Sequence, residues 1–179
     1  MADRMSAEIM IGGKLRRSWL DEFPVSGLRL DWDEGVLPPL SEADLLAARM
    51  PDSGVLRFCD YEAAWGEFQE LEGWLREHNM PFHRYSGAKY EYSAELVQFR
   101  PDLRGKRNRD VSTLTTPDGD PVVSVAEVEK VVERMAKLAA DRKRSADKRL
   151  QAWARLFRAL TRILPPKLPP LPPFEIADG

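Results

Sequence analysis

The chain has 179 residues, of which 43% are hydrophobic and 31% are charged. This length predicts one domain, or one domain with an extended appendage, and this apolar content excludes wholesale disorder. The formal net charge of −2 gives, by itself, no reason to expect nucleic acid, an anionic membrane or another polyanion as the partner.

The first hundred residues alternate strand-like and helix-like periodicity. Leu28, Leu30 and Trp32 alternate with charged residues as in a half-buried strand, and apolar residues at helical spacing run along 61–78. In chain order we expect strand, helix, strand, short helix, strand, helix and hairpin over 7–11, 14–23, 28–32, 42–49, 55–59, 61–78 and 82–92. Residues 7–100 therefore predict an α+β head, a small two-layer sandwich of ferredoxin-like type.

The remaining residues predict an elongated C-terminal half. Residues 101–123 form a basic linker with a strand-like stretch near 111–115, and residues 124–163 predict one long helix or two helices with a hinge near 141–145. The proline-rich tail, residues 164–179, begins with LPPKLPPLPP, which is typical of polyproline II. That tail predicts either a strap packed on the domain or a peptide for an aromatic-lined groove.

Charge is divided unevenly between the two halves. Residues 1–100 carry 11 basic and 18 acidic side chains, whereas residues 101–179 carry 16 basic and 11 acidic ones. Within residues 130–162 there are 11 basic and 3 acidic side chains. The division predicts an electrostatic interface with a partner, or mutual neutralisation of the two halves.

The expected helix over 61–78 carries acidic residues along most of its length and two tryptophans. An acidic surface of this kind could dock a basic protein or imitate a row of phosphates, and tryptophan is enriched at binding hot spots. An ordinary solvated face is the alternative. The partner-binding candidates are Glu62, Glu67, Glu70, Trp65 and Trp74.

The sharpest basic feature lies in the expected hinge and the segment after it. This stretch has no apolar stripe, and its like charges repel unless something anionic neutralises them. The candidate residues for nucleic-acid or anion binding are Arg142, Lys143, Arg144, Lys148 and Arg149. Ahead of them, a heptad-like seam allows homodimerisation through Val125, Val128, Val132 and Met135.

Catalytic signals are weak. Cys59 and His83 are a possible thiol–imidazole pair, and the acidic turns near 31–34 and 118–120 could hold a divalent cation if a further carboxylate arrived in space. The sequence Gly12-Gly13-Lys14 lacks the glycine and the Ser/Thr that a phosphate-binding loop requires. We expect no cofactor and no metal.

These observations predict a non-enzymatic macromolecular interaction protein, a small inhibitor or adaptor that acts by charged-surface occupancy, with a nucleic-acid-handling complex as the suggested target. A protein partner is the first expectation. Sequence-independent nucleic-acid binding through the basic C-terminal helix is the first alternative, and an enzyme using Cys59 and His83 or a carboxylate metal site is the second. The single cysteine and the lack of a long apolar segment predict a cytoplasmic protein that does not bind membranes.

Overall fold

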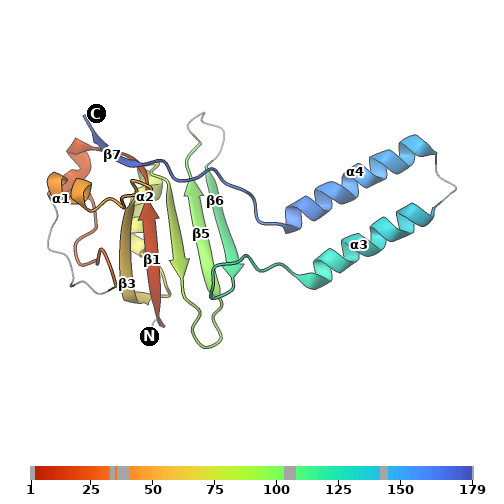
Figure 1. Ribbon diagram of the computed structural model, residues 1–179, viewed down its shortest axis with the longest axis horizontal. Helices are drawn as coiled ribbons and strands as arrows, with labels where there is room; N and C mark the ends of the chain where they lie inside the picture. Colours follow the sequence, from red (N-terminus) through yellow and green to blue (C-terminus); the bar gives the residue numbers. More distant parts are fainter. Residues whose placement is uncertain (1–2, 33–34, 36–40, 103–107, 142–144, 179) are drawn as a thin grey trace. The chain divides into compact units, whose positions relative to one another are not determined.

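The computed structural model describes residues 3–32, 35, 41–102, 108–141 and 145–178. The chain divides into two compact units, Met1–Asp120 with Leu168–Gly179, and Pro121–Lys167. We call the first the head and the second the helical unit (Figure 1). The end of the tail thus belongs to the head, although the helical unit separates the two in sequence.

The head is built on a five-stranded sheet of order β3-β1-β4-β5-β6 in which all neighbours are antiparallel. Since β3 and β4 both run antiparallel to β1, which lies between them, helix α2 (Gln69–Glu77) connects two parallel strands across β1. The α+β class is confirmed, and the ferredoxin-like detail is not. The strands are β1 (Arg4–Ile11), β3 (Leu56–Ala64), β4 (Phe82–Ser86), β5 (Ala94–Arg100) and β6 (Arg109–Thr115).

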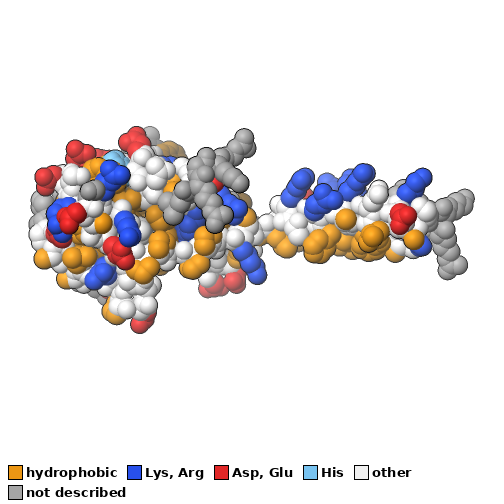
Figure 2. Space-filling view, turned by 90° about the horizontal axis from the view of Figure 1, so that it is seen from above, with side chains coloured by type: hydrophobic (Ala, Val, Ile, Leu, Met, Phe, Trp, Pro, Cys, Tyr) orange, Lys and Arg blue, Asp and Glu red, His pale blue; other side chains and the backbone are white. Residues whose placement is uncertain are grey.

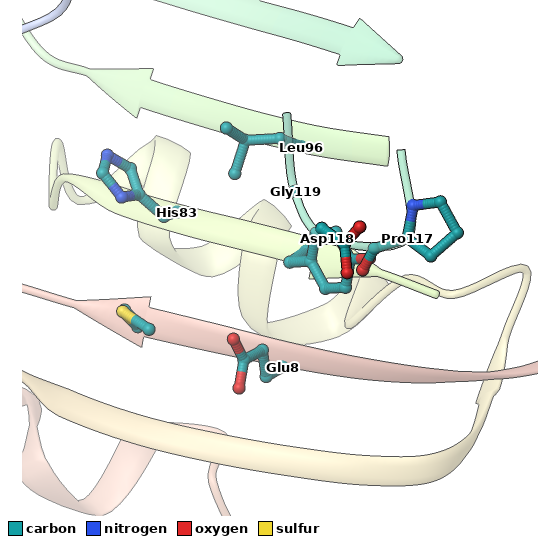
Figure 3. A pocket seen from close by; sticks show the side chains of 8 residues that line it. Glu8, His83, Leu96, Pro117, Asp118 and Gly119 are labelled. Atoms are coloured by element: carbon teal, nitrogen blue, oxygen red, sulfur yellow. The ribbon is translucent and has the colours of Figure 1, made fainter. Parts of the chain in front are cut away.

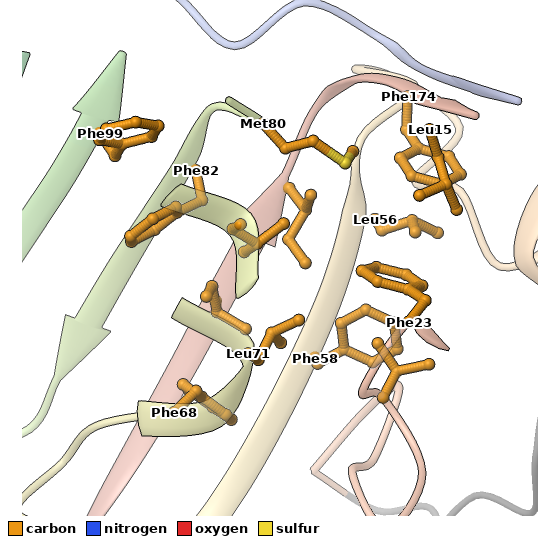
Figure 4. Close-up of a cluster of buried hydrophobic side chains, with 14 of the residues drawn as sticks. Leu15, Phe23, Leu56, Phe58, Phe68, Leu71, Met80, Phe82, Phe99 and Phe174 are labelled. Carbon is orange, nitrogen blue, oxygen red and sulfur yellow. The ribbon is translucent and has the colours of Figure 1, made fainter. Parts of the chain in front are cut away.

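One face of this sheet forms the hydrophobic core. Along β1, every second side chain from Met5 to Ile11 is buried, the period expected of a strand with one covered face. Helix α2 covers that face with Leu71 and Leu75, which join Phe58 and Phe82 in one cluster (Figure 4). The opposite face of the sheet carries the residues of the pocket described below.

A second, parallel pair of strands joins the two ends of the head. Strand β2 (Gly13–Arg16) pairs with β7 (Phe174–Ala177), and the 3-10 helix η1 (Arg17–Glu22) follows β2. The expected α-helix over 14–23 is therefore wrong. Leu15, which fits a helical stripe, is instead fully buried in β2 because a strand from the far end of the chain supplies its hydrogen-bonding partner.

The expected helix over 61–78 is also wrong in its first half. Strand β3 continues to Ala64, and α2 begins only at Gln69. Trp65 and Gly66 between them have left-handed φ angles of 59° and 68°, which break any helix. A Cβ at position 66 would lie 2.6 Å from the Cβ of Ser86, so this turn needs glycine.

Of three further expected elements in the head, the short helix is confirmed, whereas the strand over 28–32 and the hairpin over 82–92 are corrected. Helix α1 (Glu42–Ala47) confirms the expected short helix and begins with a capping box, in which the side chains of Ser41 and Asp44 accept hydrogen bonds from each other's backbone N–H groups. The stretch 28–32 forms only an isolated bridge between Arg29 and Cys59, and the strand after β4 is β5, beginning at Ala94, with a bridge between Lys89 and Tyr92 before it.

The helical unit consists of α3 (Val125–Ala140) and α4 (Ala146–Ile163), so the expected helical region contains two helices. They pack as an antiparallel hairpin (Figure 1). The three residues Arg142, Lys143 and Arg144 of the expected hinge lie outside the described residues. No described helix is long and apolar enough to cross a membrane.

Candidate functional site

The two helices of the helical unit contact each other through a heptad seam. On α3, Val131 and Leu138 are buried and Val128 and Met135 half-buried. On α4 the seam is made of half-buried residues at alternating steps of three and four: Arg149, Ala152, Leu156, Ala159 and Ile163. Val128 and Met135, two of the four residues expected to form a homodimer seam, thus face the chain's own second helix.

Beside the seam, one face of the hairpin is apolar and exposed. Val125 and Val132, the other two seam candidates, are 68% and 53% exposed. On α4, Leu150, Trp153 and Phe157 follow one another at helical spacing and are 71%, 39% and 62% exposed. Because the helices are antiparallel, these two stripes lie on the same side of the hairpin, and Figure 2 shows hydrophobic side chains gathered along one edge.

The opposite face of the hairpin is cationic. Lys130 and Lys137 are one heptad apart on α3, and Lys148, Arg155 and Arg162 form a row with the same spacing on α4. All five are exposed, and Figure 2 shows lysine and arginine gathered along the edge opposite the apolar one. Neighbours within a row are about 10 Å apart at 1.5 Å per residue. No described lysine or arginine of the helical unit forms an ion pair.

This face was only partly visible from the sequence. Of the five basic candidates, Lys148 lies in the cationic row, whereas Arg149 is half-buried toward the seam. Lys130, Lys137, Arg155 and Arg162 were missed, although their spacing of seven could have identified them.

The acidic candidates do not share a helix face. Glu62 lies on strand β3, Glu67 precedes α2, and only Glu70 is on the helix. The acidic residue that the helix does bury is Glu72, which pairs with Arg84 and Arg76 inside the head.

The two tryptophan candidates lie apart in the same way. Trp74 is half-buried against the core and stacks on His78, with ring centroids 3.8 Å apart. Trp65 is 42% exposed and packs edge-on against Tyr92. The expected acidic, tryptophan-bearing surface is therefore dispersed.

The open face of the head sheet carries a pocket of about 270 Å³ lined by His83, Glu8 and the loop 117–119 (Figure 3). Cys59 lies on β3 opposite Glu8, which in turn is opposite Tyr85 on β4. Since β1 separates β3 from β4, the backbones of Cys59 and His83 are about 10 Å apart or more. The structure does not bring this thiol and imidazole together.

Electrostatics also distinguish these two groups from a catalytic pair. Burial raises the pKa of the Cys59 thiol to about 11, although the Arg57 guanidinium opposes the shift. Burial, reinforced by the Arg100 guanidinium, lowers the pKa of His83 to about 4. Gln98 and Arg100 both contact His83 Nε2 with donor nitrogens, so Nε2 acts as the acceptor of a neutral ring.

Neither the glycine turn nor the acidic turns supply a ligand site among the described residues. At the β1–β2 turn, the backbone N–H groups of Gly12 and Gly13 donate to the carbonyls of Pro81 and Pro173, so they are not available to an anion. Among the described residues, no three His, Cys, Asp or Glu side chains converge on a possible metal position. Asp33 and Glu34 of the first acidic turn lie outside the described residues.

The proline-rich tail lies against the head as a strap. Arg100 Nε donates to the carbonyl of Pro169 at 2.9 Å, and the N–H of Phe174 donates to the carbonyl of Gly54 at 2.9 Å. Phe174 is fully buried, and its ring stacks against that of Phe23 with the two centroids 6.4 Å apart. Residues 165–173 have no regular secondary structure, and the polyproline II conformation is not confirmed.

Comparison with protein-family models, with curated proteins and with solved structures gives no match for this chain. The functional argument therefore rests on the chain's own geometry. Of the surfaces described, the cationic face of the hairpin has the most charge without a partner in the chain.

Proposed function

We propose that this chain is a non-enzymatic interaction protein, a small adaptor or inhibitor that acts by occupying a charged surface, and that it binds nucleic acid through the cationic face of the α3–α4 hairpin. One observation carries the proposal. Five exposed cations stand in two heptad-spaced rows, and no described acidic side chain pairs with them.

The chemistry of that face favours the phosphate backbone over the bases. Lysine and arginine gain affinity from displacing the counterions that surround a nucleic acid, and this gain does not depend on base sequence. The large aromatic side chains of the hairpin, Trp153 and Phe157, lie on the opposite, apolar face. Stacking on unpaired bases is therefore not expected to contribute, and duplex and single strand should bind through charge alone.

A salt titration with two charge-matched variants tests this proposal. We expect labelled duplex DNA of two unrelated sequences to bind equally well, with log K falling linearly as log salt rises. Replacing Arg155 and Arg162 by glutamine should reduce the steepness of that line by about 1.8, since each lost phosphate contact contributes about 0.9. Replacing the exposed head residues Arg16 and Arg109 by glutamine changes net charge equally and should leave the line unchanged.

Equal effects of the two variants would show that net charge, not the hairpin, determines binding. Absence of binding at low salt would refute the nucleic-acid proposal outright. Tight binding to an acidic protein in place of DNA, lost in the R155Q/R162Q variant, would assign the same face to a protein partner. Cytoplasmic location, the absence of a cofactor and the non-enzymatic character remain predictions within this proposal.

A further inference from the structure

Among its described residues, the head contains a buried cation that is not paired with a carboxylate. Two arginines are buried there, Arg84 at 2% and Arg100 at 6% exposure. Arg84 pairs with Glu72 and Glu95, whereas no described acidic side chain pairs with Arg100. Burial lowers the pKa of the Arg100 guanidinium, and no described carboxylate opposes that shift. Since an unpaired buried charge is costly, Arg100 favours an anion from outside the chain.

Neutral acceptors take four of the five N–H groups of Arg100. Nε donates to the carbonyl of Pro169 at 2.9 Å, and Nη1 donates to the carbonyls of Phe82 and Phe99 at 3.1 and 2.7 Å. Nη2 donates to His83 Nε2. Since Nη2 carries two N–H groups, one of them has no acceptor among the described residues. The guanidinium is therefore held in place with its charge uncompensated and one donor left over.

Arg100 lines a groove of about 550 Å³ between the strap and the end of the sheet where β4 begins and β5 ends. Most of its wall consists of proline rings, which are flat and apolar; they belong to Pro81, Pro101, Pro169, Pro170, Pro172 and Pro173. Asn79 lines the same groove, and because its Oδ1 accepts from Asn108, its Nδ2 is the end that can donate to a ligand. A largely apolar cleft of about 300–1,000 Å³ with a few polar groups is the usual form of a small-molecule site.

The charge of the lining suits a ligand with one negative charge. Besides Arg100, the lining contains Lys14 and Glu175, which form an exposed ion pair with Nζ and Oε2 3.6 Å apart. These two charges cancel, so the lining carries the single positive charge of Arg100. A carboxylate would neutralise that charge, whereas a phosphate group brings about −1.5 to −2 charges at neutral pH.

We propose that this groove binds a small carboxylic acid with a flat apolar body. Its carboxylate accepts the remaining N–H of Arg100 and an N–H of Asn79, and its body lies against the proline rings. An aromatic body fits such a wall, because aromatic ring faces are electron-rich and pack well on C–H groups. The inference does not depend on nucleic-acid binding, since the groove lies in the head and the cationic face lies in the helical unit.

Calorimetric titration of the full chain with two matched probes tests the carboxylate. The probes are 2-naphthoate, a flat aromatic carboxylate, and 2-naphthamide, which has the same shape and no charge. We expect 2-naphthoate to bind with a dissociation constant of about 1 mM or lower, as is usual for a ligand of this size. The amide should bind about 10-fold more weakly, because it lacks the charge that pairs with Arg100.

Glu175→Gln locates the site without disturbing the contacts of Arg100. The substitution removes the one negative charge of the lining, so 2-naphthoate should bind about two- to five-fold more tightly, and the amide should bind as before. Glu62→Gln removes the same charge at an exposed position on β3, outside the groove. This control should leave the binding of both probes unchanged.

Arg100→Met removes the guanidinium and keeps an unbranched side chain. We expect this variant to bind 2-naphthoate and 2-naphthamide equally, because the carboxylate no longer meets a cation. Arg100 also bonds the strap through Pro169. The comparison therefore uses a variant whose far-UV circular dichroism matches the wild type, and if the variant does not fold, Glu175→Gln decides the question.

Four results would overturn the inference. Absence of 2-naphthoate binding at roughly 10 mM, ten times the expected constant, contradicts the site itself. Equal binding of acid and amide to the wild type, or a preference for the acid that survives in folded Arg100→Met, contradicts the role of Arg100. An unchanged constant in Glu175→Gln places the probe elsewhere. Inorganic phosphate that displaces 2-naphthoate and binds more tightly would assign Arg100 to phosphate instead of a carboxylic acid.

Discussion

Arg84 and Glu72 form an ion pair in the interior of the head, with Nε and Oε1 2.9 Å apart and side chains only 3% and 7% exposed. Arg84 also reaches Glu95 through Nη2 at 2.7 Å and donates through Nη1 to the carbonyl of Gly66. The pair links α2 to the middle strand of the sheet. Because Gly66 lies in the turn between β3 and α2, this one guanidinium connects that turn, helix α2 and the sheet.

Removing the charge of Glu72 should therefore be costly. Glu72→Gln leaves Arg84 with less compensation in a buried position, which typically costs about 3–5 kcal/mol. Glu70→Gln, on the exposed side of the same helix, should change the free energy of unfolding by no more than about 0.5 kcal/mol. Urea denaturation of both variants measures the difference. Similar values for the two would show that the Arg84 pair adds nothing to the stability of the head.

The proline-rich strap packs so closely on Gly12 that adding one methyl group there should destabilise the head. A Cβ on Gly12 would lie 2.1 Å from the carbonyl oxygen of Pro172, which is a backbone atom and cannot rotate away. We expect Gly12→Ala to lower the free energy of unfolding by about 1–3 kcal/mol, as overpacking does. Gly73→Ala, in α2 with no atom within 4 Å of the new Cβ, should instead stabilise by about 0.5–1 kcal/mol. A neutral Gly12→Ala would mean that the strap is not held at this turn.

The difference between local and long-range contacts explains which elements of the fold could be predicted from the sequence. Local signals were sufficient for α1, where Ser41 and Asp44 cap the helix, and for α3, which begins after Ser124. They failed for β2, because Leu15 lies in a strand only through its pairing with Ile176 at the other end of the chain. Pairing between residues so far apart in the sequence cannot be predicted from the residues next to either strand.

The expected helix over 61–78 failed for a different reason. Its apolar spacing suits both a helix and the actual strand, turn and short helix, since Phe68 and Leu71 are buried either way. Gly66 marks the turn that interrupts the pattern, but a single glycine within a helical pattern is only weak evidence that the helix is broken there. In the helical unit a helical region over 124–163 was expected, so the seven-residue spacing of Lys148, Arg155 and Arg162 was sufficient to predict the cationic row.

His83 predicts a loss of stability in mildly acidic solution. Its pKa is lowered to about 4 in the folded head by burial and by Arg100, whereas an unfolded histidine titrates near 6.5. Between these values the unfolded chain binds more protons, so the free energy of unfolding falls as the pH falls from about 6.5 toward 4. The whole shift corresponds to about 3 kcal/mol, which solvent screening of the half-buried ring reduces to roughly 1–2 kcal/mol.

Urea denaturation at pH 7 and pH 5 measures this loss, and His83→Gln should make it smaller. Glu95 does not interfere in this range. Although burial opposes the shift, hydrogen bonds from Ser112 and Arg84 lower the pKa of Glu95, so its contribution is lost only as the pH falls below about 4.5. An identical loss in the wild type and in His83→Gln would remove His83 as its cause.

Cys59 should be unreactive in the folded protein. The side chain is fully buried on β3, and burial raises the pKa of its thiol from 9.0 to about 11. At pH 8 the shift alone lowers the thiolate fraction by about 100-fold, and the thiolate is the reactive form. We expect labelling by a thiol reagent to be slow in buffer and fast in urea. Rapid labelling of the folded chain would mean that the thiol is accessible, and would favour the enzymatic alternative over the binding protein proposed above.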